Sequence, residues 1–340
     1  MASLLDRKLI VVTGKGGTGK TTVACALGLL AARQGLRTIV AELGDQHRLP
    51  VLFGNTLASE SGVEIELEPD LWSTSIDPDR ALLEWLRTLG GRISVRMLAA
   101  SSTFHYFSAA APGAKELVSM VKVRELCQGQ RSRKDQGSYD LVVLDAPATG
   151  HALAMLRSPQ TFATIVRTGP LAEQAQGVRE LLEDPRRSAY VAVTEGSEMA
   201  VSETLELEEG LRRHLDRDLD AVVVNGTIPR RFTREELGRI ATLDDAGDNA
   251  ATDASHLLAR ARAAEIPHNE RDAGLLRSAA HMARTVHERA RLQQSQIARL
   301  RRQRFADGMP PGVVTVPFLF TPELDLAAVR EIAARLAHKL

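Results

Sequence analysis

Cysteine is scarce in this 340-residue sequence, and its scarcity excludes several classes of protein. The two cysteines, Cys25 and Cys127, are too few for a disulfide framework or a cysteine-rich metal cluster. A tetrahedral zinc site needs about four nitrogen or sulfur ligands, which two distant cysteines do not supply. Few cysteines are typical of a reducing compartment, so we expect a cytoplasmic protein.

The sequence also lacks long apolar runs and any excess of charge. The first apolar stretch is interrupted at Arg33, which makes it too short to span a bilayer, and MASLLDRKLIVVTGK does not resemble a secretory signal. The 43 basic residues balance 43 acidic ones, which disfavours nonspecific binding to a polyanion. We therefore expect no stable membrane insertion and no nucleic-acid partner. Hydrophobic residues, at 44%, are ample for a buried core.

Short, continuously apolar segments alternate with helical patterns along the chain. Such segments are typical of strands that are covered by helices on both faces of a parallel sheet. They are Leu9–Thr13, Arg37–Glu42, Trp72–Ile76, Tyr139–Asp145, Ala189–Thr194, Asp220–Asn225 and Val313–Phe318. The alternation predicts an α/β fold with a doubly wound, mostly parallel sheet, formed by residues 1–340 as a single domain.

Two longer segments depart from the alternation, and both are predicted to be helical. A helical insert is expected at about residues 78–136, where two helical patterns are separated by Pro112-Gly113. A further helical segment is expected at about residues 233–304, and its part from Ala280 to Arg304 has the spacing of one long amphipathic helix. The sheet domain is therefore expected to carry a helical subdomain.

The strongest motif is VVTGKGGTGKTT at residues 11–22, which satisfies the Walker A pattern G-x-x-x-x-G-K-[ST]. A predicted strand precedes the motif, and a predicted helix from Lys20 to Gln34 follows it. The glycines let successive backbone N–H groups point at phosphate oxygens, and the start of the helix adds its positive dipole end. The motif predicts a P-loop that binds ATP through Gly16, Gly17, Thr18, Gly19, Lys20, Thr21 and Thr22.

Three residues in and near this loop are predicted to act on the phosphates and a metal ion. Lys20 supplies charge to the β- and γ-phosphates, and the Thr21 hydroxyl is a ligand for Mg²⁺. Asp145 ends a predicted strand at the edge where open α/β sheets bind ligands, which favours a Walker B role beside the metal over a helix cap. The loop expected at Pro147, Thr149 and Gly150 is placed to sense the γ-phosphate.

A second lysine of the loop, Lys15, has two interpretations. It is either a solvent-exposed charge or a cation that reaches a nucleotide held by another subunit across a dimer interface, because Lys20 would repel it at its own phosphates. The second interpretation makes Lys15 a charge clamp, and such groups contribute ~10³–10⁵ in turnover in related phosphoryl-transfer enzymes.

The loop KGGTGKTT, with its additional Lys15, resembles the deviant Walker A motif of the signal-recognition, MinD and ParA-like class of ATPases. Within that class, DAPATGHALAMLRSP at residues 145–159 is similar to switch II of the ArsA family, which includes the arsenite-pump ATPase and the ATPase that escorts tail-anchored membrane proteins. The family form is DTAPTGH, so residues 145 and 149–151 match and residues 146–148 differ. Further similar segments are APGAKELVSM, VTEGSEMAVSETLELEEGL, VVVNG and VPFLFTPELDLAAVREIAARL. The resemblance spans nearly the whole chain and is greatest to single-domain actinobacterial relatives.

The resemblance implies an ATP-hydrolysing switch that works as a dimer, with an identical chain or a related ArsA-like subunit as partner, and couples nucleotide state to a helical surface for an unknown client protein. It also implies that Asn225 hydrogen-bonds the adenine edge and that Pro317 and Phe318 line the adenine pocket. The alternative for Asn225 is a polar residue that closes a strand, and for the other two it is core packing. The client surface would include Met97, Phe104, Tyr106, Phe107, Met120 and Met155, for which packing of the subdomain is the competing interpretation.

The sequence departs from the family in switch I. The family places there an aspartate that orients the attacking water, and an ungapped register puts Gly44 at that position. Asp45 is the first candidate for this role and Glu42 the second. The departure motivates an alternative function, a nucleotide-binding scaffold subunit with weak or no hydrolysis. A ParA/MinD-type positioning ATPase and a small-molecule kinase of the P-loop class are further alternatives. The absent zinc and arsenite cysteine motifs disfavour zinc-clamped dimerisation and metalloid pumping.

Overall fold

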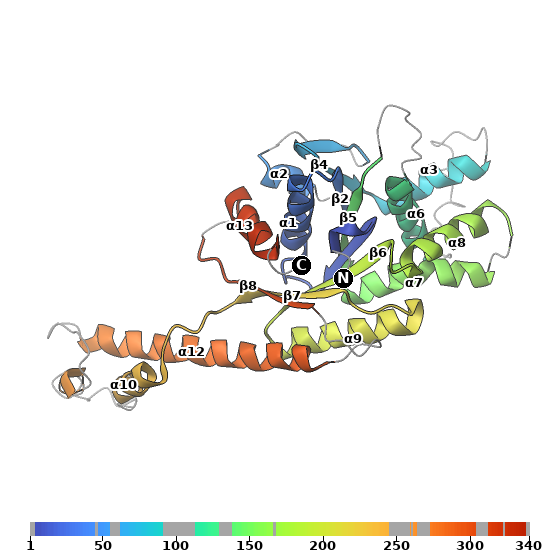
Figure 1. Ribbon diagram of the computed structural model, residues 1–340. Helices are drawn as coiled ribbons and strands as arrows, with labels where there is room; N and C mark the ends of the chain where they lie inside the picture. The colour runs from blue at the N-terminus through green and yellow to red at the C-terminus, as the bar shows by residue number, and fades with distance from the viewer. Residues whose placement is uncertain are drawn as a thin grey trace.

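The computed structural model describes residues 4–44, 47–54, 62–90, 113–128, 138–165, 168–244, 259, 261–263, 273–303, 312–321 and 324–337. Its centre is an eight-stranded sheet with the strand order β3-β4-β2-β5-β1-β6-β7-β8 (Figure 1). The strands are β1 (Leu9–Gly14), β2 (Thr38–Leu43), β3 (Ile65–Glu68), β4 (Leu71–Ile76), β5 (Leu141–Ala148), β6 (Ser188–Glu195), β7 (Ala221–Thr227) and β8 (Gly312–Pro317). All neighbouring pairs are parallel except β3 and β4. The predicted α/β fold with a mostly parallel sheet is confirmed.

The two faces of the sheet carry separate hydrophobic cores, which explains the continuously apolar strand sequences. Along β1, Leu9 and Val11 pack into the core on one face, and Ile10 and Val12 pack into the core on the other. Because successive side chains of a strand point to opposite faces, a strand that is buried on both sides is mostly apolar along its whole length. The edge strand β3, which we did not predict, has the sequence IELE and is only partly buried, so it lacks the continuous apolar run.

Helices cover both faces of the sheet. The first core, which includes Ile10 and Val12, contains residues of α1 (Lys20–Arg33) and α13 (Leu326–Ala337). The short helix α2 (Arg48–Leu52) also contacts α1. The second core includes Leu9 and Val11 of β1. Its helical residues come from α3 (Pro78–Gly90), α6 (Ala114–Gln128), α7 (Thr149–Ile165), α8 (Pro170–Glu183) and α9 (Glu198–Leu215). Met120 and Met155 are buried in this second core and are therefore packing residues, not part of an exposed client surface. Residues 97 and 104–107, also predicted for that surface, lie outside the described residues.

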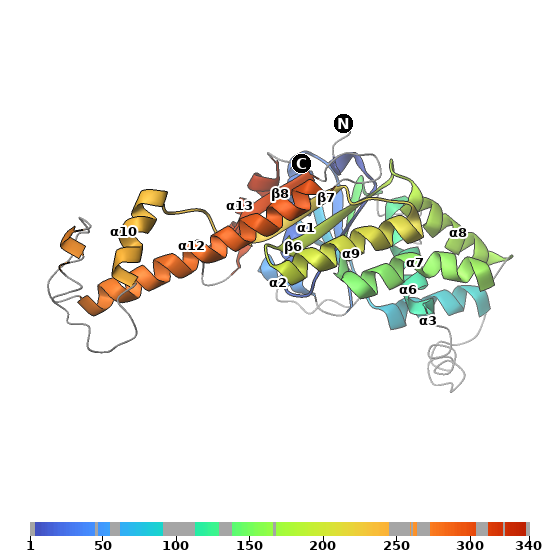
Figure 2. The ribbon, with the colours of Figure 1, turned by 90° about the horizontal axis from the view of Figure 1, so that it is seen from below.

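The long amphipathic helix predicted near the C-terminus is α12 (Ala273–Arg302). One part of α12 lies beside α9 and the sheet, and the other runs away from the body of the molecule next to α10 (Arg234–Asp244), as Figures 1 and 2 show. At 1.5 Å per residue a helix of this size is roughly 45 Å long. It therefore reaches well beyond the edge of the sheet.

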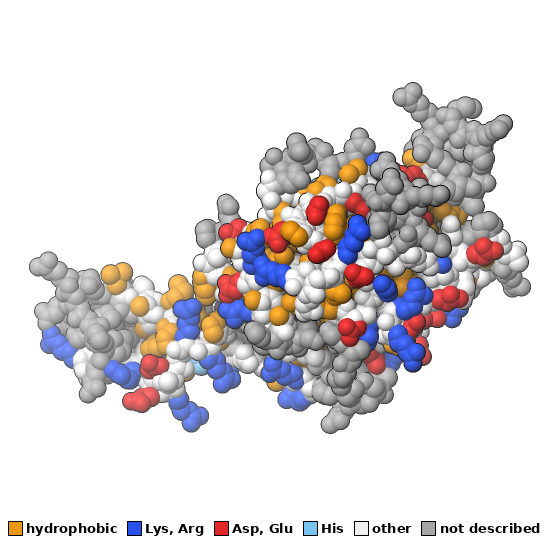
Figure 3. All heavy atoms as spheres, turned by 45° about the horizontal axis from the view of Figure 1, so that its top comes forward, with side chains coloured by type: hydrophobic (Ala, Val, Ile, Leu, Met, Phe, Trp, Pro, Cys, Tyr) orange, Lys and Arg blue, Asp and Glu red, His pale blue; other side chains and the backbone are white. Residues whose placement is uncertain are grey.

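The surface carries charged side chains of both signs, and the two thiols lie inside the protein. Basic and acidic side chains are interspersed over the face drawn in Figure 3, with no large area of one sign. Within the described ranges, none of the helices combines the length and apolar character that crossing a bilayer requires. Cys25 and Cys127 are both buried, and burial raises the pKa of each thiol to about 12. Both thiols therefore stay protonated and act as packing groups.

Candidate functional site

The Walker A loop connects β1 to α1 and is fixed by close backbone packing. Gly14 ends β1 with φ 143°, and a Cβ atom at this position would lie 2.0 Å from the carbonyl oxygen of Val193 on β6. The Thr18 hydroxyl lies 2.9 Å from the carbonyl oxygen of Lys15 and 3.0 Å from that of Val193. Gly19, with φ 91°, is the N-cap of α1 and provides no side-chain hydrogen bond to the helix. The first N–H groups of α1 are therefore available to an anion.

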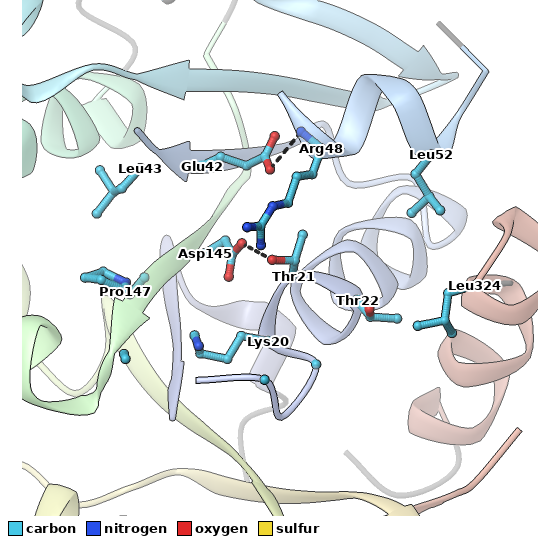
Figure 4. A pocket seen from close by; sticks show the side chains of 14 residues that line it. Lys20, Thr21, Thr22, Glu42, Leu43, Arg48, Leu52, Asp145, Pro147 and Leu324 are labelled. Carbon is cyan, nitrogen blue, oxygen red and sulfur yellow. Dashed lines mark hydrogen bonds between the residues drawn. The ribbon is translucent and has the colours of Figure 1, made fainter. Parts of the chain in front are cut away.

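A cavity of about 550 Å³ opens at this loop (Figure 4). It is bounded by the P-loop and by the ends of β2 and β5, with α2 on the far side. The lining residues are Gly17, Gly19, Lys20, Thr21, Thr22, Glu42, Leu43, Arg48, Leu52, Asp145, Ala146, Pro147, Ala148 and Leu324. The structure thus brings most of the predicted phosphate-binding residues and Asp145 to one cavity. Its position beyond the carboxyl ends of parallel strands is where open α/β sheets bind ligands.

Thr21 and Asp145 are in direct contact inside this cavity. The Thr21 hydroxyl donates a 2.6 Å hydrogen bond to Oδ2 of Asp145. The other carboxylate oxygen, Oδ1, is buried and has no hydrogen-bond partner among the residues that the structure describes. Burial raises the pKa of Asp145, and the Thr21 hydrogen bond and the nearby Lys20 and Arg48 only partly oppose this effect. A hydroxyl and a carboxylate with an unpartnered oxygen form a hard oxygen donor pair that fits Mg²⁺.

The ammonium group of Lys20 is held over the loop. It donates a 3.2 Å hydrogen bond to the carbonyl oxygen of Lys15. Its pKa is lowered, mainly because partial burial disfavours the charged form, although Asp145 has the opposite effect. Phosphate oxygens in the cavity would stabilise the charged form. Lys20 therefore presents a cation to the cavity beside the P-loop.

Lys15 points to a different part of the molecule. Its ammonium group forms a 2.8 Å ion pair with Glu203 of α9, and the two side chains are 29% and 33% exposed. Lys15 does not line the phosphate cavity. The second lysine of the loop is consequently directed to the surface, on the side of α9.

The residues predicted for the adenine pocket lie near each other at the ends of β7 and β8. The Asn225 amide donates a 2.9 Å hydrogen bond to the carbonyl oxygen of Thr18 and accepts a 3.0 Å hydrogen bond from the N–H of Gly226. Pro317 ends β8, and Phe318 is 51% exposed and packs edge-to-face against Phe320, with ring centroids 4.9 Å apart. Asn225 thus contacts the P-loop directly, beside an exposed aromatic pair.

Switch I lies only partly within the described residues. Asp45, the first candidate for orienting water, lies outside the described residues. The second candidate, Glu42, is buried, and its two carboxylate oxygens accept hydrogen bonds of 3.2 and 3.3 Å from the N–H groups of Arg48 and Leu49. Glu42 therefore holds the start of α2. Arg48 also lines the cavity, and no residue pattern in the sequence pointed to it.

The segment after Asp145 is not the loop that we predicted. β5 continues to Ala148, and α7 begins directly at Thr149. Ala148 pairs with Gly14, and the Thr13 hydroxyl donates a 2.8 Å hydrogen bond to the carbonyl oxygen of Pro147, so contacts with β1 keep this segment extended. The sequence alone could not show these contacts. The buried Thr149 hydroxyl has no hydrogen-bond partner in the described part of the chain, and His151 is exposed.

Comparisons with known proteins agree with this geometry. Residues 7–169 match the anion-transporting ATPase family. The chain is 28% identical to the ATPase BagA of Mycobacterium tuberculosis over 316 residues, which cover 90% of this chain and 89% of that protein. It is 24% identical to the ATPase GET3 of Candida glabrata over 263 residues, or 67% of this chain and 74% of that protein. It is 31% identical to the ATPase ASNA1 homolog 1 of Paramecium tetraurelia over 160 residues, or 45% and 44% of the two chains.

The matched region contains the P-loop, β2 and α2, Asp145 and the start of α7, which are the elements around the cavity. The match with BagA extends over most of the chain, including the strands and helices that follow. The resemblance inferred from the sequence motifs is thereby confirmed. Residues 7–169 therefore form a domain of the anion-transporting, ArsA-type ATPase family, and this match together with the related ATPases supports ATP hydrolysis by the chain.

Proposed function

We propose that this ATPase is a dimeric switch that binds MgATP in the cavity beside the P-loop and couples the nucleotide state to a protein client. The partner subunit is either a second copy or a related ArsA-like chain. ATP binds through residues 16–22, with its phosphates on the N-terminus of α1 and on Lys20. Asn225, Pro317 and Phe318 form the adenine side of the site.

The orientation of Lys15 is the observation that carries the dimer proposal. The side chain is outside its own phosphate cavity and is paired with Glu203 at the surface. An exposed pair of this kind contributes at most about 1 kcal/mol, so the lysine can exchange Glu203 for a better anion at small cost. A triphosphate on a facing subunit is such an anion. Lys15 would then neutralise charge on the transferred phosphoryl group of the partner's nucleotide.

Chemistry at the site follows from the remaining residues. Thr21 and Asp145 would hold Mg²⁺, which would supply positive charge to the phosphate oxygens. Lys20 holds the same phosphates from the side of the loop and stabilises the charge that develops on the leaving oxygen. The hydrogen bond from Asn225 to the carbonyl oxygen of Thr18 links the P-loop to the end of β7, where the adenine base is proposed to bind.

The connection from the site to a client surface runs through α7. Because β5 passes into α7 without a loop, a displacement at Asp145 is transmitted to a helix that packs against α6, α8 and α9. These helices form the second core and most of the surface on that side of the sheet. Release of the γ-phosphate is therefore expected to shift this helical layer and to change its affinity for a client.

Two lysine variants test the proposal. Lys20→Ala is expected to abolish nucleotide binding or turnover, and normal hydrolysis by this variant would contradict the assigned site. Lys15→Ala is expected to lower kcat by at least about a hundredfold with less than a threefold change in nucleotide affinity, because the clamp acts in the transition state. Equal losses in turnover and affinity would exclude the cross-subunit role. Light scattering with a nonhydrolysable ATP analogue measures dimer formation directly.

One observation supports a second candidate, a subunit that needs a related partner for turnover. The Glu42 carboxylate is engaged by two backbone N–H groups, so it is not available to orient water in this arrangement. A purified chain with slow turnover that accelerates when a related ArsA-type subunit is added would favour this candidate. Equal turnover with and without the second chain would exclude it.

A further inference from the structure

Arg48 is a cation of the cavity to which neither the motifs nor the comparisons give a role. It is the first residue of α2, and Figure 4 shows its side chain pointing from that helix toward Asp145 and Thr21. Among the described residues, its guanidinium group forms no hydrogen bond and no ion pair. An arginine head that lines the cavity and forms no ion pair with a described carboxylate is available to a ligand.

The backbone of Arg48 is anchored although its side chain is exposed. Glu42 accepts hydrogen bonds from the N–H groups of Arg48 and Leu49, and both Glu42 and Leu49 are buried. The base of the side chain is therefore held on the sheet while the guanidinium extends into open space. A residue that is fixed at its backbone loses less conformational entropy when its head group binds an anion.

The strand order shows which end of a nucleotide Arg48 would meet. The residues proposed for the adenine side lie at the ends of β7 and β8, on one side of β1. Arg48 follows β2, which lies beyond β5 on the other side of β1. A nucleotide that crosses the P-loop from the adenine side therefore directs its terminal phosphate toward α2.

The charges in the cavity agree with this direction. Arg48 and Lys20 are close enough that Arg48 contributes to the lowered pKa of Lys20, and it also acts on Asp145. Two cations thus face the cavity from opposite walls, and Asp145 is near both. A terminal phosphate carries the additional negative charge that distinguishes ATP from ADP, and it would lie between the two walls.

We infer that Arg48 binds the terminal phosphate of ATP and thereby makes the site selective for ATP over ADP. The inference rests on the proposed placement of the nucleotide, with adenine at β7 and β8. Arginine is suited to this role because its planar fork donates two parallel hydrogen bonds to phosphate oxygens. It adds to the site a phosphate contact from the side opposite the P-loop.

The test measures equilibrium affinity for ADP and for a nonhydrolysable ATP analogue, both with Mg²⁺, by calorimetry. Arg48→Ala is expected to weaken binding of the ATP analogue by about ten- to a hundredfold, the range for a hydrogen bond to a charged group. Its affinity for ADP is expected to change by less than about threefold. Arg48→Lys keeps the charge but not the fork, so its loss should be intermediate.

Arg335→Ala is the matched control, because Arg335 is exposed on α13, pairs with Glu331 and lies outside the cavity. It is expected to leave both affinities unchanged. Unchanged selectivity in Arg48→Ala, or equal losses for the two nucleotides, would overturn the inference. If thermal unfolding shows that Arg48→Ala is poorly folded, the ratio of affinities in Arg48→Lys decides in the same way. Failure of the wild-type chain to bind either nucleotide would instead contradict the proposed function.

Discussion

Replacement of Gly14 by alanine tests the packing that shapes the P-loop. Gly14 has φ 143°, a region that is unfavourable for residues with a Cβ atom, and a Cβ atom there would lie 2.0 Å from the carbonyl oxygen of Val193. That distance is far inside van der Waals contact, so β6 or the loop has to move. Because Val193 also lies next to the Thr18 hydroxyl, the displacement affects the loop itself.

The magnitude follows from two terms. An unfavourable backbone conformation costs about 1–3 kcal/mol, and forcing additional atoms into a packed region costs about 1–3 kcal/mol. The sum is ~2–6 kcal/mol. A chain of this size has an unfolding entropy of roughly 0.7 kcal/mol per degree, so Gly14→Ala is expected to lower Tm by about 3–9 °C.

Gly16→Ala is the matched control in the same loop. A Cβ atom at Gly16 meets nothing within 4 Å, and its φ lies outside the region that disfavours other residues. Its Tm is expected to stay within about 1 °C of the wild type, since a tolerated alanine also reduces the entropy of the unfolded chain. Thermal unfolding without nucleotide measures both variants. A Gly14→Ala protein as stable as the wild type, or a Gly16→Ala protein equally destabilised, would refute the reasoning.

Three further experiments test the charges and contacts around the cavity. Asp145→Asn should abolish Mg²⁺-dependent turnover yet raise the Tm of the nucleotide-free protein. Burial raises the pKa of Asp145 in the folded state above its value in the unfolded chain. The contribution of Asp145 to wild-type stability is therefore most favourable below its unfolded-state pKa and is lost as pH rises through its folded-state pKa. The Tm advantage should therefore shrink on acidification, and an advantage that grows instead would contradict this sign. A double-mutant cycle of Lys15→Ala and Glu203→Gln should give a coupling of about 0.2–1 kcal/mol in unfolding free energy, and a larger value would show that the pair is not readily exchanged. Asn225→Ala, which loses hydrogen bonds to Thr18 and Gly226, should reduce the ATP-to-GTP affinity ratio, and an unchanged ratio would remove Asn225 from adenine recognition.

Much of the fold could be predicted because burial on both faces of a parallel sheet leaves a direct pattern in the sequence. Seven of the strands were predicted near their observed positions, most of them from nearly continuous apolar runs. The edge strand β3 was missed because it is only partly buried and carries Glu66 and Glu68. The loop expected after Asp145 was wrong because its extended form depends on hydrogen bonds to β1, which is distant in the sequence.

Local sequence by itself determined the P-loop, since its glycines, Lys20 and Thr21 act through backbone conformation and immediate neighbours. Tertiary structure decided the contacts between distant segments: Thr21 with Asp145, Lys15 with Glu203, and Asn225 with the carbonyl oxygen of Thr18. The position of Arg48 was also decided by the tertiary structure, because only the strand order places the start of α2 across the cavity from the P-loop. A short motif specifies the conformation of its own backbone. Which side chains meet across the cavity depends on how the sheet orders strands that are far apart in the chain.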